Sequence, residues 1–91
     1  MRYLVVLDSR TTIGAHYLPE NNNDGMVGDG NLKHPALDCP EIDPSNFHYL
    51  IVTREMKRGE GTQKLYIPHS SVAYIVCYSD EGPKPMGFLS A

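Results

Sequence analysis

The stretch LYIPHSSVAYIVCY, residues 65–78, decides the fold class of this chain. Together with Lys64 it reads as two short strands, 64–67 and 72–78, separated by Pro-His-Ser-Ser. Val, Ile and Tyr suit the pleated, half-buried surface of a β-strand. Pro68 has no N–H and a fixed φ, so it ends a strand, and the small hydroxyl residues complete a turn. The stretch therefore predicts two consecutive strands of an all-β domain.

Three further strands are predicted earlier in the chain. Residues 3–7 form a tight apolar run. Residues 11–18 (TTIGAHYL) are expected to return as a second strand, with Gly14 marking a bulge or a sharp bend. Residues 47–54 (FHYLIVTR) predict a third strand, and the polar, glycine-containing segment 55–62 predicts a hairpin. The resulting fold class is all-β: a five-stranded small barrel or β-roll.

Residues 19–46 differ in kind from these strands. The segment is rich in Asn, Asp and Gly and carries Pro35, Pro40 and Pro44, which favours turns and irregular chain. It also holds six acidic side chains and one lysine, so the rest of the chain is slightly basic. We expect a long irregular insertion inside one domain, 1–79, followed by an extended tail, 80–91.

The strands predict self-association. Val, Ala, Tyr, Ile and Cys alternate along 72–78, and Tyr, Leu and Val along 3–7, so both faces of each strand are apolar. No long amphipathic helix is expected to cover the second face. Exposed contiguous apolar surface usually marks an interface, which predicts a homo-oligomer. The alternative is that tyrosines leave their hydroxyls in water and that the outer faces are merely amphipathic.

Bulk properties narrow the class of protein. Ninety-one residues with a formal charge of −3 fit one globular domain and argue mildly against a strong phosphate binder. The N-terminal run is too short for a secretory signal, and no run reaches transmembrane length. Cys39 and Cys77 lack metal-type spacing, and Cys77 is expected to be a buried thiol in its strand. These features predict a cytoplasmic protein with no cofactor and no metal site.

Residues 64–78 resemble the final strand pair of an Sm-like barrel, the family that includes the Sm, LSm and Hfq proteins. The resemblance implies subunits joined edge to edge in a ring, with the turn between the last two strands placed to touch a nucleotide. The chain departs from the family because it begins with a strand instead of a helix and carries the insertion at 19–46. An unrelated SH3-like barrel would give the same strand pattern and remains an alternative.

Two turns supply the candidate ligand-binding residues. His69 can stack on a base, the serine hydroxyls can bind a base edge or phosphate, and an arginine beside hydroxyls suits an anion. The bland alternatives are a solvated histidine, local serine hydrogen bonds and a surface arginine. The predicted site consists of Arg10, Thr11, Thr12, His69, Ser70 and Tyr74, with Lys57 and Arg58 as secondary phosphate contacts.

No nucleophile elbow, phosphate-cradling loop or recognisable acid/base pair is present, which argues against an enzyme. The sequence predicts a self-associating binding protein for a nucleotide-type ligand, either short single-stranded RNA or a small signalling nucleotide, which is bound or sequestered where subunits meet. The alternative is a protein–protein assembly module that uses a sheet edge, the acidic segment or the tail.

Overall fold

The structure is a computed structural model, and it describes residues 1–29, 31–56, 59, 61–81 and 88–89 of the chain. Most of these residues lie in β-strands, which confirms the β-rich class. In chain order the elements are β1 (Arg2–Leu7), α1 (Thr12–His16), the 3-10 turn η1 (Glu20–Asn22), β2 (Gly25–Asp29), β3 (Leu32–Cys39), β4 (Glu41–Asp43), β5 (Tyr49–Glu55), β6 (Thr62–Pro68), the 3-10 turn η3 (His69–Ser71), β7 (Val72–Tyr78) and β8 (Phe88–Leu89).

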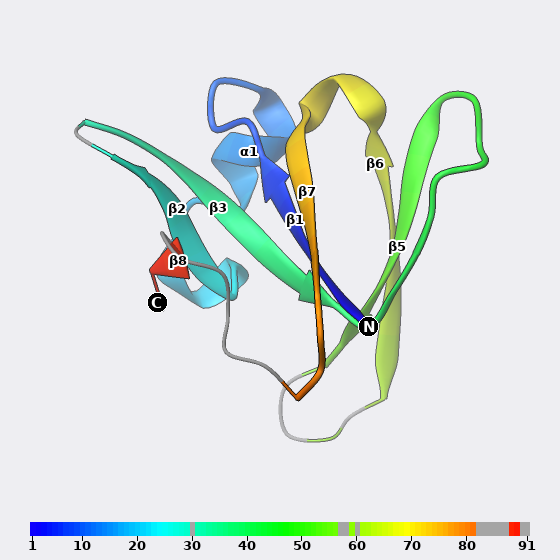
Figure 1. Cartoon of the computed structure of the whole chain (residues 1–91). Helices are drawn as coiled ribbons and strands as arrows, with labels where there is room; N and C mark the ends of the chain where they lie inside the picture. Colours follow the sequence, from blue (N-terminus) through cyan, green and yellow to red (C-terminus); the bar gives the residue numbers. More distant parts are fainter. Residues whose placement is uncertain (30, 57–58, 60, 82–87, 90–91) are drawn as a thin grey trace.

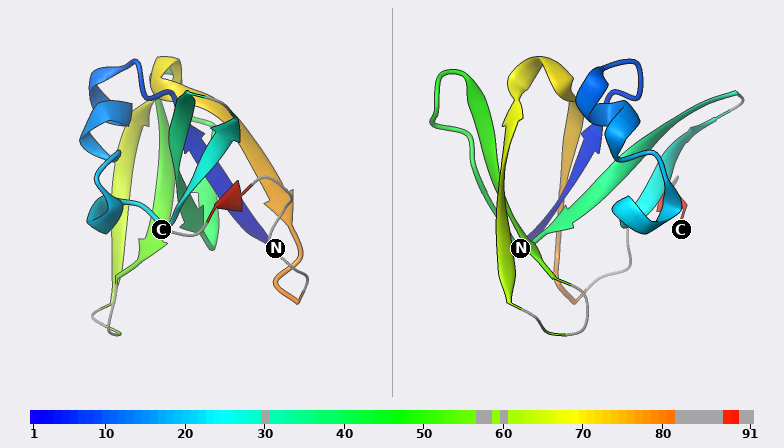
Figure 2. Two further views of the ribbon diagram at one scale, coloured as in Figure 1. Left: turned by 90° about the vertical axis from the view of Figure 1, so that its left-hand side faces the viewer. Right: turned by 180° about the vertical axis from the view of Figure 1, so that it is seen from behind.

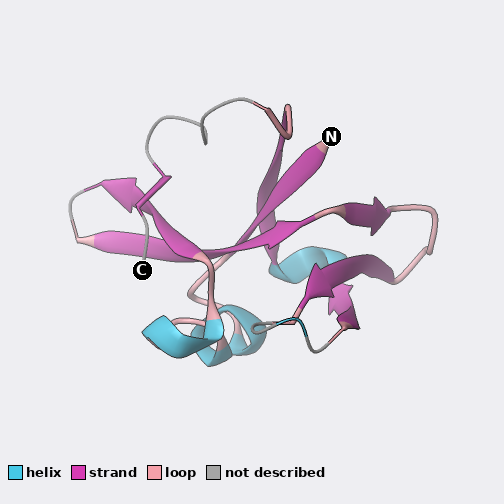
Figure 3. Cartoon of the chain, turned by 90° about the horizontal axis from the view of Figure 1, so that it is seen from below, coloured by secondary structure: helices cyan, strands magenta, loops and turns pink. Residues whose placement is uncertain are grey.

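The strands form two antiparallel sheets (Figures 1 and 2). The larger has the order β7-β1-β3-β2-β8 and the smaller the order β4-β5-β6. In the described part of the chain, β7 and β8 are the edges of one sheet and β4 and β6 the edges of the other. Of the predicted five-stranded small barrel or β-roll, the β-rich class is confirmed, but the described strands form two sheets and not a closed barrel. The view from below shows the β2–β3 hairpin reaching away from the smaller sheet (Figure 3).

β1 is buried on both of its faces. Leu4, Val5, Val6 and Leu7 are each no more than 1% exposed, because β1 lies between β7 and β3. Val5 and Leu7 point into the core between the sheets, and Leu4 and Val6 point to the opposite face. Ala36, which lies opposite Val6 in the register, is also fully buried. A single chain thus shelters both faces of this strand, so β1 gives no reason for a second copy.

The main core lies between the two sheets. Each sheet contributes one row of alternating apolar side chains, as expected for packed β-layers. α1 closes one end of this core with two partly buried side chains. The buried members are Val5, Leu7, Leu37, Cys39, Leu50, Val52 and Ile67, and Ile13, Tyr17, Ile42, Leu65 and Val72 pack against them.

The prediction of an irregular insertion at 19–46 is wrong, since this segment supplies β2, β3 and β4. β3 is the central strand of the larger sheet, and its residues 35–37 are fully or almost fully buried. Pairing of β3 with β1 stops at Ala36, so Pro35 is paired only with β2, at Met26. That position accommodates a residue without an N–H. Proline and the scattered acids obscured the strand pattern of β3, which pairs with its neighbour β2 and with the distant strand β1.

The prediction of a strand at 11–18 is also wrong, because α1 forms there. Thr11 caps the helix: its backbone is extended and its Oγ1 accepts a hydrogen bond from the N–H of Gly14. Gly14 is buried against the preceding turn, where an added Cβ would lie 1.9 Å from the carbonyl oxygen of Asp8. Gly14 therefore permits α1 to pack closely on the end of β1, and it marks neither a bulge nor a barrel corner.

β8 lies in the segment predicted as an extended tail, 80–91. It pairs with β2, with Phe88 opposite Val27 and Leu89 opposite Met26. In the described residues, no helix has the length and apolar character required to cross a membrane.

Asn23 fixes the chain between α1 and β2. Its side chain is 1% exposed, and its Nδ2 donates to the carbonyl oxygens of Tyr17 (2.8 Å), Leu18 (3.1 Å) and Pro19 (3.2 Å). Its Oδ1 accepts from the N–H of Gly25 at 3.0 Å. The buried Asn23 side chain thus provides hydrogen-bond partners for carbonyl groups of the chain that follows α1 and for the N–H of Gly25, the first residue of β2.

We expect Asn23→Ala to lower the free energy of unfolding by about 2–3 kcal/mol, because it leaves buried backbone groups without partners. Urea denaturation followed by circular dichroism measures this loss. Asn22→Ala is the matched control, since Asn22 makes one side-chain hydrogen bond, to the carbonyl of His16. Equal losses in the two variants would show that Asn23 has no special role.

Candidate functional site

The structure brings the two predicted ligand-binding turns to the same end of the molecule. The N–H of Asp8 donates to the carbonyl oxygen of Ser71 at 2.8 Å, which joins the turn after β1 to η3. Both segments lie at the top of the molecule beside α1 (Figures 1 and 2). Thr12, His69 and Ser70 are exposed there.

Arg10 is occupied by its own turn. Its Nε and Nη2 donate to the two carboxylate oxygens of Asp8, each at 3.0 Å, and its N–H donates to Oδ1 at 2.9 Å. These hydrogen bonds lower the pKa of the Asp8 carboxyl to about 2 and raise the pKa of Arg10. The Asp8–Arg10 pair carries no net charge. The guanidinium group of Arg10, which was predicted to bind an anionic ligand, is therefore already bound to the carboxylate of Asp8.

The hydroxyl group of Thr11 is also engaged in hydrogen bonds within this turn. It donates to the carbonyl oxygen of Asp8 at 2.7 Å while accepting from Gly14 as the cap of α1. Local capping thus accounts for the Asp-Ser-Arg-Thr pattern. Such short-range hydrogen bonds are characteristic of these residue types before a helix.

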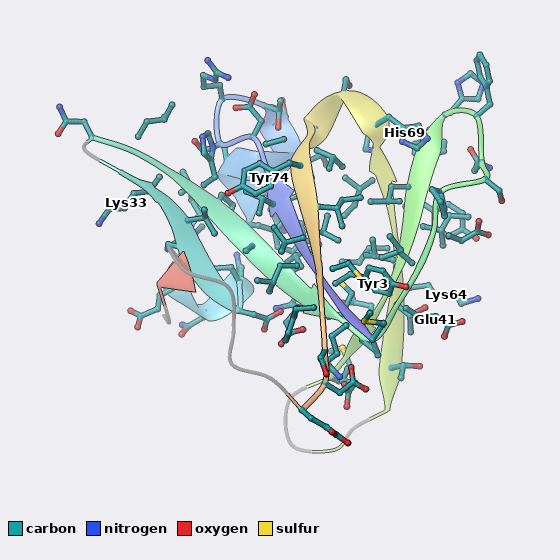
Figure 4. The ribbon with its side chains drawn as sticks, in the orientation of Figure 1. Tyr3, Lys33, Glu41, Lys64, His69 and Tyr74 are labelled. Carbon is teal, nitrogen blue, oxygen red and sulfur yellow. The ribbon has the colours of Figure 1, made fainter. Side chains whose placement is uncertain are left out.

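The second turn connects to the smaller sheet. Nε2 of His69 lies 2.8 Å from the carbonyl oxygen of Asn46, and the His69 N–H donates to the carbonyl of His48 at 3.3 Å. Tyr74 lies on β7, opposite Val6, and is 47% exposed. The labelled side chains of His69 and Tyr74 lie on different sides of β7 (Figure 4). The structure therefore joins the two turns but separates His69 from Tyr74.

The two predicted secondary phosphate contacts, Lys57 and Arg58, lie outside the described residues. Arg54 is the nearest described arginine in the sequence. Arg54 points inward and donates from Nε and Nη2 to Asp24, with a side chain only 13% exposed. Asp24 also accepts from the N–H of Asp38 at 2.8 Å. Arg54 therefore connects the two sheets and is not available to a phosphate.

A second group of polar side chains lies at the opposite end of the molecule from the two turns, near the first residue of β1 (Figure 1). Arg2 pairs with Asp38 at 3.0 Å and with Glu55 at 2.9 Å, and the Tyr78 hydroxyl donates to the Asp38 carboxylate at 2.9 Å. Burial opposes the charge of Arg2, but the hydrogen bonds to both carboxylates raise its pKa. Burial and the contact with Asp38 raise the pKa of Tyr78. The arrangement links β1, β3, β5 and β7 and is structural in character.

The two cysteines differ in burial. Cys39 is fully buried in the core, and burial raises the pKa of its thiol to about 12. Cys77 is exposed because β7 is an edge strand, so the prediction of a buried Cys77 is wrong. Across the described part of the chain, no three metal-binding side chains come together.

The outward side of the smaller sheet forms a surface that the sequence did not reveal. We call it the aromatic face. Residues directly opposite in the register share a side of the sheet, and alternate residues along a strand do too. The outward side chains are Glu41 and Asp43 of β4, Tyr49, Ile51, Thr53 and Glu55 of β5, and Thr62, Lys64 and Tyr66 of β6.

Aromatic rings dominate one end of this face. Tyr66 is 60% exposed and Tyr49 is 41% exposed, and their ring centroids lie 6.2 Å apart in an edge-to-face contact. The contacts continue through His48 to Phe47, which is 88% exposed. Each ring was visible in the sequence, but the adjacency of Tyr49 and Tyr66 depends on the β5–β6 register.

The Asp8–Arg10 contact gives a prediction about pH. In Arg10→Ala the pKa of Asp8 should rise from about 2 toward the ordinary aspartate value near 4, because the guanidinium donors are lost. A folded-state pKa below the unfolded value stabilises the fold above about pH 4, and that contribution disappears as pH falls toward 2. The stability difference between wild type and Arg10→Ala should therefore shrink over this range.

Carbon-detected NMR titration of the aspartate carboxyl groups measures the pKa directly, and urea denaturation between pH 2 and pH 5 measures the linked stability. Asp43, whose pKa is lowered by hydrogen bonds from Ser45, serves as the internal control and should not move. An unchanged Asp8 pKa in Arg10→Ala would contradict the role of this contact.

Comparison of the chain with protein-family models, with curated proteins and with solved structures found no match. The resemblance to Sm-like barrels at 64–78 stays a prediction. Inference about function therefore starts from the chain's own residues.

Proposed function

We propose that this protein is a non-enzymatic binding module that contacts another polypeptide through the aromatic face. The observation that carries the proposal is the row of exposed rings formed by Tyr66, Tyr49 and Phe47. Tyrosine and phenylalanine are enriched at the centres of protein interfaces, where they bury large area at low cost in side-chain entropy.

The charges around the rings favour a polypeptide over a nucleic acid. Glu41 and Asp43 lie on the same face and would repel phosphates, whereas Lys64 is the single described base among the outward residues of β4–β6. A face with aromatic centre and charges of both signs at its rim has the usual composition of a protein-binding surface.

A photo-crosslinker placed at position 66 tests this proposal. With Tyr66 replaced by p-benzoylphenylalanine and expressed in the native host, we expect an adduct with a polypeptide. Tyr74 is the matched control, because it is a tyrosine of comparable exposure on the other sheet. Tyr66→Ala should then weaken binding of the captured polypeptide by about thirtyfold, as for an interface residue worth about 2 kcal/mol. An adduct from position 74 but not from 66 would refute the proposal.

A second candidate is the nucleotide-type ligand predicted from the sequence, either short single-stranded RNA or a small signalling nucleotide. The observation in its favour is that the Asp8–Thr12 turn and η3 lie side by side, with Thr12, His69 and Ser70 exposed. In this reading the hydroxyls and His69 contact the ligand, and Arg10 takes part only if the ligand displaces Asp8.

Thermal unfolding with added nucleotides distinguishes this candidate, because a ligand that binds only the folded state raises Tm. His69→Ala should abolish the rise, measured against that variant's own ligand-free Tm. His48→Ala is the control, since His48 is a neighbouring exposed histidine outside the predicted site. No rise with any mononucleotide, cyclic dinucleotide or short RNA would exclude the second candidate.

A further inference from the structure

The aromatic face carries an ordered arrangement of charge. Glu41 and Lys64 both lie opposite Thr53 in the strand registers, one on each side of β5. They therefore lie at the same position along the strands and on the same face, with the negative charge at the β4 edge of the sheet and the positive charge at the β6 edge. Two strand spacings, about 10 Å, separate them, and within the described residues neither takes part in an ion pair. Figure 4 labels both side chains.

The next row repeats this polarity. Asp43 and Tyr66 both lie opposite Ile51, so an acid again occupies the β4 edge and a hydrogen-bond donor the β6 edge. Glu41 and Asp43 thus form one side of the face and the donors Lys64 and Tyr66 the other, while Glu55, at the end of β5, is paired with Arg2. The centre of the face is the line of Tyr49, Ile51 and Thr53 along β5.

We propose that the occupant of the aromatic face is a second copy of this chain, related by a two-fold axis that runs along β5 between the two molecules. This inference rests on the proposed function and names its partner. Rotation about that axis places β4 of each copy over β6 of the other. Glu41 of one copy then faces Lys64 of the second, and Asp43 faces the Tyr66 hydroxyl, each contact occurring twice.

The charge pattern selects this axis over its alternative. A two-fold axis across the strands would place β4 over β4, so that the acids of the two copies would oppose each other. Like charges at close range across an interface are costly, whereas opposite charges set orientation and register. Apolar contact of Ile51, Tyr49 and Tyr66 supplies most of the stabilisation, because exposed ion pairs contribute little individually.

Paired charge reversals test the geometry. Wild type should sediment as a dimer, at twice the 10.2 kDa chain mass. Glu41→Lys and Lys64→Glu should each weaken dimerisation by at least about tenfold, since each reversal makes two like-charge contacts. The double variant should dimerise again. A mixture of the two single variants should form a heterodimer, because both of its contacts then join opposite charges.

Native mass spectrometry with one variant ¹⁵N-labelled identifies the heterodimer, and analytical ultracentrifugation gives the dissociation constants. Lys33→Glu is the matched control, because Lys33 is exposed on β3, away from the aromatic face (Figure 4), and should leave the dimer intact. Thermal unfolding of every variant verifies that the fold persists.

A wild-type chain that stays monomeric at several hundred micromolar would overturn the inference, and so would single variants that dimerise as wild type does. If position 66 still crosslinks a different polypeptide, the binding module stands and the second copy does not. If position 66 crosslinks nothing and the chain is monomeric, both fail.

Discussion

Burial of β1 on both faces is the constraint on which the remaining structure depends. A strand with Leu and Val on either side must occupy the middle of a sheet and be covered above and below. β3 and β7 pair with it on its two edges, and the smaller sheet covers the face that carries Val5 and Leu7. Burial of β1 thus requires contacts with strands from the segment between residues 24 and 43 and from the C-terminal half of the chain.

Charged side chains complete this arrangement where the apolar rows end. The Asp24–Arg54, Arg2–Asp38 and Arg2–Glu55 contacts join residues that are 30 to 53 positions apart, and all of these residues except Glu55 are partly buried. Pairs of this kind offset the cost of removing charges from water only when their geometry is satisfied, so they favour one arrangement of the two sheets. The acidic character of residues 19–46 is consequently divided: Asp24 and Asp38 hold the fold together, while Glu41 and Asp43 remain on the outward side of β4.

The same division shapes the functional argument. Arg10 and Thr11, which were predicted to bind a ligand, make hydrogen bonds to Asp8, and Thr11 also accepts one from Gly14 in the first turn of α1. On the outward side of the smaller sheet, Tyr66 contacts Tyr49 but remains 60% exposed, and Lys64 is exposed as well. Self-association, first suggested by two-faced apolar strands, now rests on another surface, because one chain buries both faces of β1.

From the sequence alone, the β-rich class, the positions of β1, β5, β6 and β7, and the turn at η3 were determined, because alternation, β-branched residues and Pro68 act over a few neighbouring positions. Other features required the tertiary structure. Thr11 and Gly14 begin a helix because Gly14 packs on Asp8, and Pro35 enters a central strand because β1 pairs no further than Ala36. Cys77 is exposed because its strand lies at an edge, and Glu41 and Lys64 flank Thr53 because three strands share a register. The last three of these features depend on how separate strands pair in the sheets, which local propensity cannot specify, whereas the helix depends on contacts within residues 8–14.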